Sequence, residues 1–378
     1  MKTGTRHVGF VLSVMAVMLL GVAPGLRADE GEQKEKPFKL SYKFGRGLTF
    51  ESASGDYSLT LSAHLQGRFT YNALESAADS DTFAIQRGKI RLEGNVFDKT
   101  VKYGFQMDLS TRTGGTATLD DYYIDWVPNS YFGLKFGQYK VPFLVQELVA
   151  DSKLQFVDRA LSTGFFDLRR DIGVTFHGDI VKDKVNYAVF AINGDGANTF
   201  NTNQGIMGGA RLEYAIVGAY DRTEPDADNS EMPNVGVGAA YVFHDSLNST
   251  SAMSQSATIP VGTKSSLATV DVGLKYRGFS FRGAGMLTRD HEGLGVTNIG
   301  YNAQFGYFVV PKKFEIAVGQ GAVFFDDATP NQYEYVGGLD YFIKGYPLRV
   351  HADYGLIMNN RGLNLNDQRV RAQVQLML

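Results

Sequence analysis

The sequence predicts an all-β protein, a transmembrane antiparallel β-barrel of about sixteen strands whose third outer loop folds inward. Three features support this prediction. The chain begins with an export signal, it contains long segments with one polar and one apolar face, and short and long connections alternate between those segments. Together they describe a sheet with hydrocarbon on one side, water on the other and no free edge.

The first 28 residues read as a secretory signal peptide. Lys2 and Arg6 precede an apolar run over residues 8–22, and Pro24 then breaks that run. The run is too short to span a membrane as a helix, and we expect cleavage after Ala28. Residues 29–56 are then a polar N-terminal segment that leads into the barrel, and residues 57–378 are the transmembrane barrel domain.

Composition narrows the possible architectures of this exported chain. It contains no cysteine, so disulfides cannot hold it together. No later stretch has the roughly 20 apolar residues that a transmembrane helix needs, so if this exported chain sits in a membrane, it must do so as a closed barrel. The 37 Lys and Arg against 40 Asp and Glu give no polycation, and nothing indicates nucleic acid as a partner.

The clearest strand covers residues 57–71. Its odd positions are mostly apolar or aromatic, whereas its even positions include His64, Gln66 and Arg68. Ordinary strands average about five or six residues, and a tilted membrane-spanning strand needs about nine to eleven. This length favours a membrane barrel whose apolar side chains face lipid and whose polar side chains face water inside.

The same pattern recurs down to the C-terminus. Within each segment the charged residues keep almost wholly to one parity, as a barrel requires, because a Lys or Arg facing lipid costs roughly 2–4 kcal/mol at mid-bilayer. Strands of a secreted β-sandwich also alternate polar and apolar residues. For any single segment, a soluble sandwich therefore stays open as an alternative to a barrel. The further segments lie near residues 83–97, 101–110, 119–127, 131–140, 170–180, 185–192, 206–215, 235–244, 268–277, 279–288, 298–310, 314–325, 333–343, 348–357 and 368–378.

Connection lengths give an independent test, because bacterial barrels have short periplasmic turns and long outer loops. Short links lie at residues 98–100, 128–130, 182–184, 277–278, 311–313 and 344–347, and longer loops separate them. The link over residues 216–234 breaks the rule, since it is long where a short turn is expected. The strand count therefore has a margin of about one hairpin.

The third outer loop, Val141–Leu168, is the longest outer connection and is too apolar to extend into solvent. We expect it to fold into the lumen and to narrow a pore that about sixteen strands otherwise leave wide. Capping of the barrel mouth or packing against a neighbouring subunit are the alternatives. The charged residues expected at the constriction are Glu147, Asp151, Lys153, Asp158, Arg159 and Asp167.

A basic patch is predicted on the inner wall. Arg68, Arg87, Lys89 and Arg91 all have inward parity, and Arg369 and Arg371 join them if the last strand closes against the first. Rows of Arg and Lys line anion pores. Inward acids are about as numerous, however, so a balanced wall that orients solutes without strong ion selectivity is the alternative.

Catalytic motifs do not appear: the six histidines are scattered and there is no GxSxG, HExxH or paired metal-ligand spacing. We therefore expect no catalytic residue, metal or cofactor. The sequence favours a channel for passive diffusion of small hydrophilic solutes, with preference for anions such as phosphate left open. A barrel enzyme acting on lipid and a barrel adhesin or structural anchor remain alternatives, which conductance measurements separate.

Four motifs resemble a known family: 87-RGKIRLEG-94, 121-DYYIDW-126, 137-GQYKVPF-143 and 169-RRDIGV-174. In order and spacing they are similar to the phosphate-selective porin O and P family. The resemblance implies a sixteen-stranded porin of a Gram-negative-type outer membrane, a homotrimer with the third outer loop inside the channel. It also implies small solutes or anions, outer-membrane lipid and lipopolysaccharide as partners. The third outer loop holds two basic residues against four acids, so phosphate specificity is not carried over.

Overall fold

The computed structural model describes residues 38–201, 205–245, 264–292, 295–327, 329–360 and 365–378, which all belong to the unit of residues 38–378. The predicted signal peptide lies outside the described residues. Among the helices that the model describes, none is both long and apolar enough to cross a membrane.

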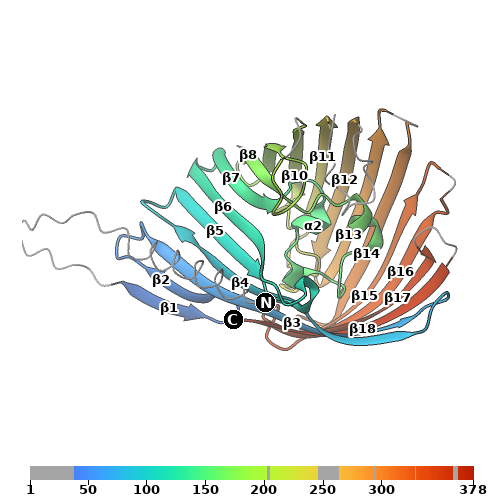
Figure 1. Cartoon of the computed structure of the whole chain (residues 1–378). Helices are drawn as coiled ribbons and strands as arrows, with labels where there is room; N and C mark the ends of the chain where they lie inside the picture. Colours follow the sequence, from blue (N-terminus) through green and yellow to red (C-terminus); the bar gives the residue numbers. More distant parts are fainter. Residues whose placement is uncertain (1–37, 202–204, 246–263, 293–294, 328, 361–364) are drawn as a thin grey trace, which may run out of the picture. The chain divides into compact units, whose positions relative to one another are not determined.

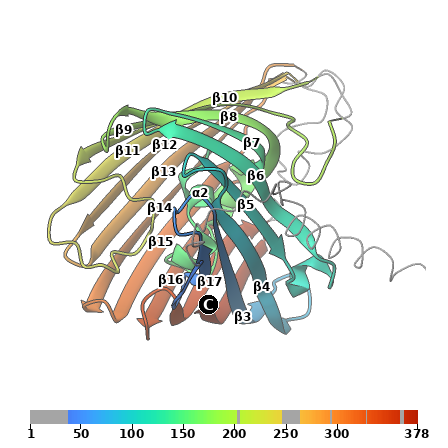
Figure 2. The ribbon, with the colours of Figure 1, turned by 90° about the vertical axis from the view of Figure 1, so that its left-hand side faces the viewer.

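The described chain is a single antiparallel sheet that closes on itself (Figures 1 and 2). Each strand from β3 to β18 pairs with the next along the chain, and β18 pairs with β3. The strands are β1 (Lys39–Lys43), β2 (Gly47–Glu51), β3 (Ser58–Ala73), β4 (Ser80–Asn95), β5 (Val101–Asp108), β6 (Thr118–Asn129), β7 (Phe132–Lys140), β8 (Arg170–Val181), β9 (Val185–Ile192), β10 (Met207–Val217), β11 (Asn234–Asp245), β12 (Lys264–Tyr276), β13 (Phe279–Asp290), β14 (Thr297–Val310), β15 (Phe314–Phe324), β16 (Gln332–Phe342), β17 (Leu348–Asn360) and β18 (Leu365–Met377).

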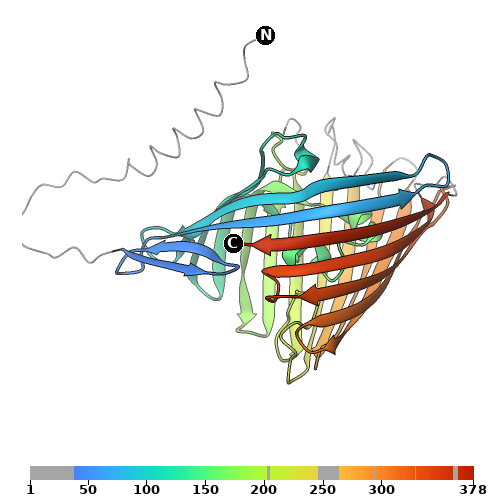
Figure 3. The same ribbon diagram turned by 90° about the horizontal axis from the view of Figure 1, so that it is seen from below.

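The barrel closes along β3, where Figure 3 shows β18 in red beside the blue strand. The register pairs Gln373 with Arg68 and Met377 with His64. The first residues of β3 extend beyond the end of β18 and pair with β2 instead, so that Leu48 lies opposite Leu61. The hairpin of β1 and β2 thus extends the sheet at the end where the chain terminates.

The predicted fold class is confirmed: β3 to β18 form a closed antiparallel barrel of sixteen strands, and each overlaps one predicted segment. The hairpin of β1 and β2 was not predicted, because two strands of five residues fall inside a segment that reads as polar. The long link before β11 does not change the strand count.

The two faces of the wall differ as a membrane barrel requires. On β17 the side chains of Val350 and Tyr354 point outward and are 38% and 47% exposed, whereas Arg349, His351 and Asp353 point inward and are buried. Exposed apolar residues therefore cover the outer face, and charged and amide side chains line the inner face. The burial of these inward-facing side chains shows that another part of the chain fills part of the lumen.

Candidate functional site

The third outer loop fills part of the lumen. It leaves the wall after β7, runs inside the ring of strands and rejoins the wall at β8 (Figure 2). Its short helices are α2 (Val145–Leu148), η2 (Asp151–Lys153) and α3 (Leu161–Phe166), and the other short helix of the described chain, η1 (Thr111–Thr113), lies in the second outer loop. The loop contacts side chains of β3, β4, β13, β15 and β17, which lie on different sides of the barrel.

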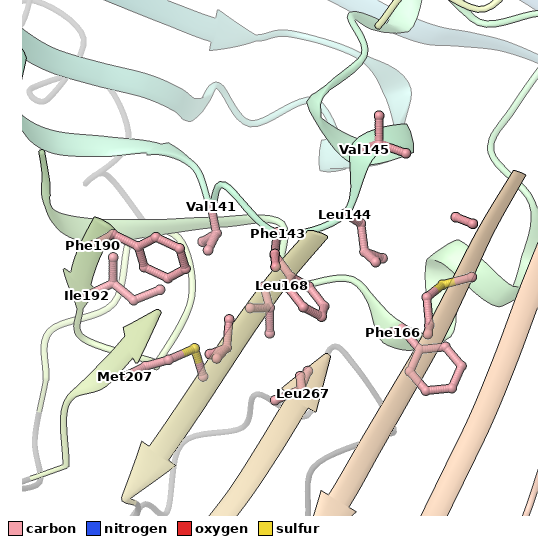
Figure 4. Close-up of a cluster of buried hydrophobic side chains, with 14 of the residues drawn as sticks. Val141, Phe143, Leu144, Val145, Phe166, Leu168, Phe190, Ile192, Met207 and Leu267 are labelled. Atoms are coloured by element: carbon pink, nitrogen blue, oxygen red, sulfur yellow. The ribbon is translucent and has the colours of Figure 1, made fainter. Parts of the chain in front are cut away.

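One side of this loop is a hydrophobic core inside the barrel. In Figure 4 the loop residues Phe143 and Leu168 lie near Met207 and Leu267 of the wall. This core explains why the loop is so apolar, because each buried side chain of this size contributes about 1.5–3 kcal/mol. The buried residues of the core are Val141, Phe143, Leu144, Val145, Phe166, Leu168, Phe190, Ile192, Met207, Ala240, Val242, Leu267, Ala284, Met286 and Val323.

Phe166 is the deepest anchor of the loop. It has no exposed surface, and its ring packs directly over Gly300 of β14. A Cβ atom at Gly300 would lie 2.3 Å from the Cε2 atom of Phe166, so the absence of a side chain there makes room for the ring. The inner wall is therefore shaped to receive α3.

The other side of the loop meets the basic patch through ion pairs. Asp158 accepts from Arg68 and from Arg87, both at 3.0 Å. Asp151 lies 3.1 Å from Arg87 Nε and 2.7 Å from Lys89 Nζ. The three cations of β3 and β4 therefore have anionic partners from the loop, and the predicted cluster of like charges is neutralised by direct contact.

The electrostatics of these two loop carboxyls follow from that contact. Burial alone would raise their pKa values, but Arg87 with Lys89 holds the pKa of Asp151 well below its ordinary value. Arg87 and Arg68 do the same for the pKa of Asp158. Both carboxyls are therefore ionised at neutral pH. The contacts of Asp158 with Arg68 and Arg87, and of Asp151 with Lys89, are charge-assisted hydrogen bonds of the stronger kind.

The two arginines of β18 also have partners. Arg371 forms two hydrogen bonds with Asp353, at 2.7 and 2.6 Å, and the same carboxylate accepts the backbone N–H of Val157 at 3.0 Å. Arg369 lies 2.8 Å from Glu334. The closing strand is therefore linked through wall acids to the third outer loop.

Glu147, Arg159 and Asp167 have partners within the loop or directly beside it. Arg159 reaches Glu147 and Asp151, both at 2.8 Å. Asp167 is buried and accepts the backbone N–H of Arg169 at 2.6 Å. Burial and the nearby Glu147 charge raise the pKa of Asp167 to about 8. These groups stabilise the loop's own conformation.

Two predicted site residues lie apart from the others. The side chain of Arg91 is 39% exposed and pairs with Glu93 of its own strand at 2.7 Å. Lys153 lies over the ring of Tyr346, with its Nζ 5.9 Å from the centroid. Arg91 therefore has an acidic partner on its own strand, whereas the loop acids Asp151 and Asp158 pair with Arg68, Arg87 and Lys89.

Counting residues along the hairpin predicts Arg68 beside Arg87 on the neighbouring strand, but the register places Gln66 opposite Arg87. The register also shifts by one residue between Gln66 and Gly67. Asp120, which the sequence pattern does not single out, lies 3.0 Å from Lys89 and 3.6 Å from Arg170. A second register shift, beside Gln106 on β5, lets Asp120 turn inward next to an inward-facing neighbour, and alternation alone does not predict this.

A polar cavity of about 840 Å³ remains between the loop and the opposite wall. Side chains of β4, of β6 to β10 and of residues 220–222 line it, together with Pro142 and Leu148 of the loop. Tyrosine rings and charged groups alternate on its surface, and Lys135 lies over the rings of Tyr123 and Tyr139 at 4.7 and 5.7 Å. Such a surface offers donors and acceptors to a hydrated solute. In the described part of the chain, no group of three or more His, Cys, Asp or Glu side chains is placed to hold a metal ion.

Solved structures of outer-membrane proteins share this fold, among them the following three. The anion-selective porin from Comamonas acidovorans aligns with a TM-score of 0.60 at 9% identity, over 85% of this chain and 100% of that one. The outer membrane channel DcaP of Acinetobacter baumannii aligns at 0.59 and 12% identity, over 88% and 100%. The trimer form of OmpT, an outer membrane protein of Vibrio cholerae, aligns at 0.54 and 11% identity, over 85% and 99%. These identities show the fold alone. No curated protein matches in sequence.

The sequence of the barrel identifies its family. Residues 61–279 match the family model described as phosphate-selective porin O and P, which covers more than half of the chain. The match runs from β3, through the basic patch and the third outer loop, to the start of β13. The chain therefore belongs to the phosphate-selective porin O and P family and is an outer-membrane porin.

Proposed function

We propose that small hydrophilic solutes cross this outer-membrane channel by passive diffusion, along the polar cavity that the third outer loop leaves open. The protein is a porin of a Gram-negative outer membrane, and its family and fold relatives indicate a channel rather than an enzyme. The observation that carries the proposed path is the division of the lumen. The loop binds polar side chains of β3, β4, β13, β15 and β17. The cavity of about 840 Å³ is lined by β4, by β6 to β10 and by residues 220–222.

The third outer loop is the proposed constriction. Its apolar side chains pack in the core around Phe166, and its carboxylates bind Arg68, Arg87 and Lys89. Because the loop is anchored to two opposite sides of the barrel, its position along the barrel axis is fixed. It therefore sets the width of the passage that remains. Five of the six predicted constriction residues, all except Lys153, form ion pairs with the wall, within the loop or with Arg169 beside it, and we propose that they fix its shape.

We propose weak ion selectivity rather than phosphate specificity. An anion-binding site needs cations that are free to bind a solute. Here Arg68 and Arg87 share Asp158, and Lys89 lies between Asp151 and Asp120. Arg91 keeps more exposed surface than these three, and it lines the cavity, so it is the cation from which we expect a slight anion preference.

The assembly is proposed to be a homotrimer. The family resemblance supports this, as does the trimer form of the Vibrio cholerae relative with the same fold. We expect lipopolysaccharide to contact the outer face of the barrel at the end with long loops. Chemical cross-linking of the detergent-purified protein tests the subunit number, since a ladder that ends at the single chain contradicts a trimer.

Liposome swelling tests the proposed function. Proteoliposomes that contain the folded protein should swell in neutral sugars of low mass and more slowly in larger ones. Reversal potentials in a salt gradient should be close to zero, with a small displacement toward anions, and phosphate should not block the current. Strong block by phosphate contradicts weak selectivity, and proteoliposomes that never swell contradict the channel itself.

A further inference from the structure

The link between β10 and β11, residues 218–233, is long where the other described links at the same end of the barrel are short. The structure shows that this link folds back into the barrel. Arg211 of β10 donates to the hydroxyl of Tyr220 at 3.1 Å, and Lys275 of β12 lies 2.6 Å from Asp221. Both wall residues are buried and point inward. The link therefore enters the lumen from the periplasmic end.

Further contacts fix the link in this position. Arg222 forms two hydrogen bonds with the carboxylate of Glu213, at 2.8 and 2.7 Å. Asp226 is buried and accepts the backbone N–H of Gly278 at 2.7 Å. These contacts join the link to β10 and to the turn before β13, so its conformation is held on both sides.

Glu224 joins this link to the third outer loop. Its Oε2 atom accepts the backbone N–H of Gln155 at 2.6 Å, and its Oε1 atom accepts from Gln146 Nε2 at 2.9 Å. The backbone N–H of Glu224 also donates to the carbonyl of Lys153 at 3.3 Å. One side chain therefore holds the loop at two points, one in α2 and one just after η2.

The chemistry of this joint requires a carboxylate. Both partners of the Glu224 side chain are N–H donors, so each of its two oxygens must accept, and a glutamine offers only one accepting atom. Glu224 is 3% exposed, and among the residues that the structure describes it forms no ion pair. A buried carboxylate that loses its hydrogen-bond donors costs free energy, and the described donors to the Glu224 side chain both belong to the third outer loop. The Glu224 side chain therefore stabilises the loop in its observed position.

Gln155 extends the joint to the far wall. Its Nε2 atom donates to Ser280 at 2.9 Å and to Glu315 at 2.7 Å, and its Oε1 atom accepts from Gln304 at 3.0 Å. The loop segment after η2 is therefore fixed between the periplasmic link on one side and β13 to β15 on the other.

We propose that the 218–233 link is a second constriction element and that Glu224 is a positioning residue that sets the height of the third outer loop in the lumen. This inference rests on the proposed function, because it assumes that the loop narrows the path of solutes. The width of the channel is then determined from both ends, by the loop that enters from outside and by the link that enters from the periplasmic side.

The test compares three variants with the unmodified full chain. Glu224→Gln removes one acceptor, and Asp228→Asn makes the same charge change elsewhere on the link, at a residue with no described side-chain bond. The double variant Glu224→Gln with Gln146→Glu exchanges the groups, so that the new amide accepts from Gln155 and donates to residue 146. Gel migration before and after heating shows for each variant whether the barrel has folded.

The readout is the frequency of brief conductance changes in planar bilayers, together with the sugar size limit in liposomes. Glu224→Gln should raise that frequency by roughly tenfold, because a bond to a charged group is lost, and should admit larger sugars. The double variant should restore part of both properties, because it regains the bonds at residue 224 but loses the bond from Gln146 to Gln304. Asp228→Asn should leave both properties unchanged. Equal behaviour of Glu224→Gln and Asp228→Asn, with all barrels folded, overturns the inference. If the unmodified chain gives no current at all, the proposed function fails instead.

Discussion

Buried Arg87 and partly exposed Asp158 form an ion pair, with 3.0 Å between Nη2 and Oδ1, that joins the barrel wall to the third outer loop. The same carboxylate binds Arg68 through its other oxygen. One aspartate therefore neutralises two arginines that the sequence places in a basic patch. The ion selectivity of the lumen depends on whether this pairing is intact.

Removal of that carboxylate should make the channel more anion-selective. In Asp158→Asn the two guanidinium groups keep their charge and lose their anionic partner, so the local potential becomes more positive. Reversal potentials in a potassium chloride gradient should move toward the anion value. Asp183→Asn is the matched control, because Asp183 is exposed on a short turn at positive φ, a conformation that asparagine also tolerates. An unchanged reversal potential in Asp158→Asn would show that the two arginines do not face the path.

Loss of the deepest loop anchor should release the loop while the barrel remains. Phe166→Ala removes a ring with no exposed surface and should cost about 3–5 kcal/mol of loop docking. We expect higher conductance and faster protease cleavage between residues 141 and 168, with normal heat-dependent gel migration. Phe97→Ala, which changes an exposed ring outside the lumen, is the control. Protection of the loop in Phe166→Ala as in the unmodified protein contradicts this account of docking.

A fully buried arginine should be critical for stability of the barrel interior. Arg349 lies 3.4 Å from Asp340 and donates to the carbonyl of Leu154 at 2.9 Å. Arg349→Met leaves a buried carboxylate without its cation and should destabilise the protein by about 3–5 kcal/mol. Unfolding temperatures followed by gel migration should fall, and the added substitution Asp340→Asn should recover part of the loss. No recovery in the double variant contradicts the ion-pair explanation.

Loop docking should weaken as pH rises toward 8, because the pKa of Asp167 is raised to about 8 by burial and by Glu147. A carboxyl with a raised folded pKa holds its proton more tightly when the loop is docked. Docking is therefore most stable below the ordinary carboxyl pKa, weakens as pH rises to about 8, and changes little above that value. Protease cleavage of the loop, measured across this range, should increase with pH and then level. Asp167→Asn should flatten the plot of cleavage rate against pH. A plot that stays as steep in this variant would assign the pH dependence of docking to another group.

The strand pattern was predictable because a membrane barrel imposes one local rule. At residues such as Val350 and Arg349 the side chain must suit lipid or water, so alternation reveals each strand and its face. The apolar content of the third outer loop likewise predicts burial. These features depend on neighbouring positions in the sequence.

The pairing of charges inside the lumen was not predictable in the same way. Alternation shows that Arg87 points inward, but only the course of the loop decides that Asp158 meets it. The alternation of polar and apolar residues also does not reveal the register shift that turns Asp120 inward. The link over residues 218–233 gave a signal, its unusual length, but its inward course depends on the long-range contacts of Glu224. Contacts between distant segments decide these features.

The central claim is that solutes pass through a lumen that the third outer loop narrows. Planar-bilayer recording tests it most directly, with the unmodified protein and with a variant in which a short Gly-Ser linker replaces residues 144–166. We predict discrete current steps for both proteins, larger in the variant. Steps of equal size would contradict the constriction, and a folded, inserted protein that gives no steps would contradict the channel.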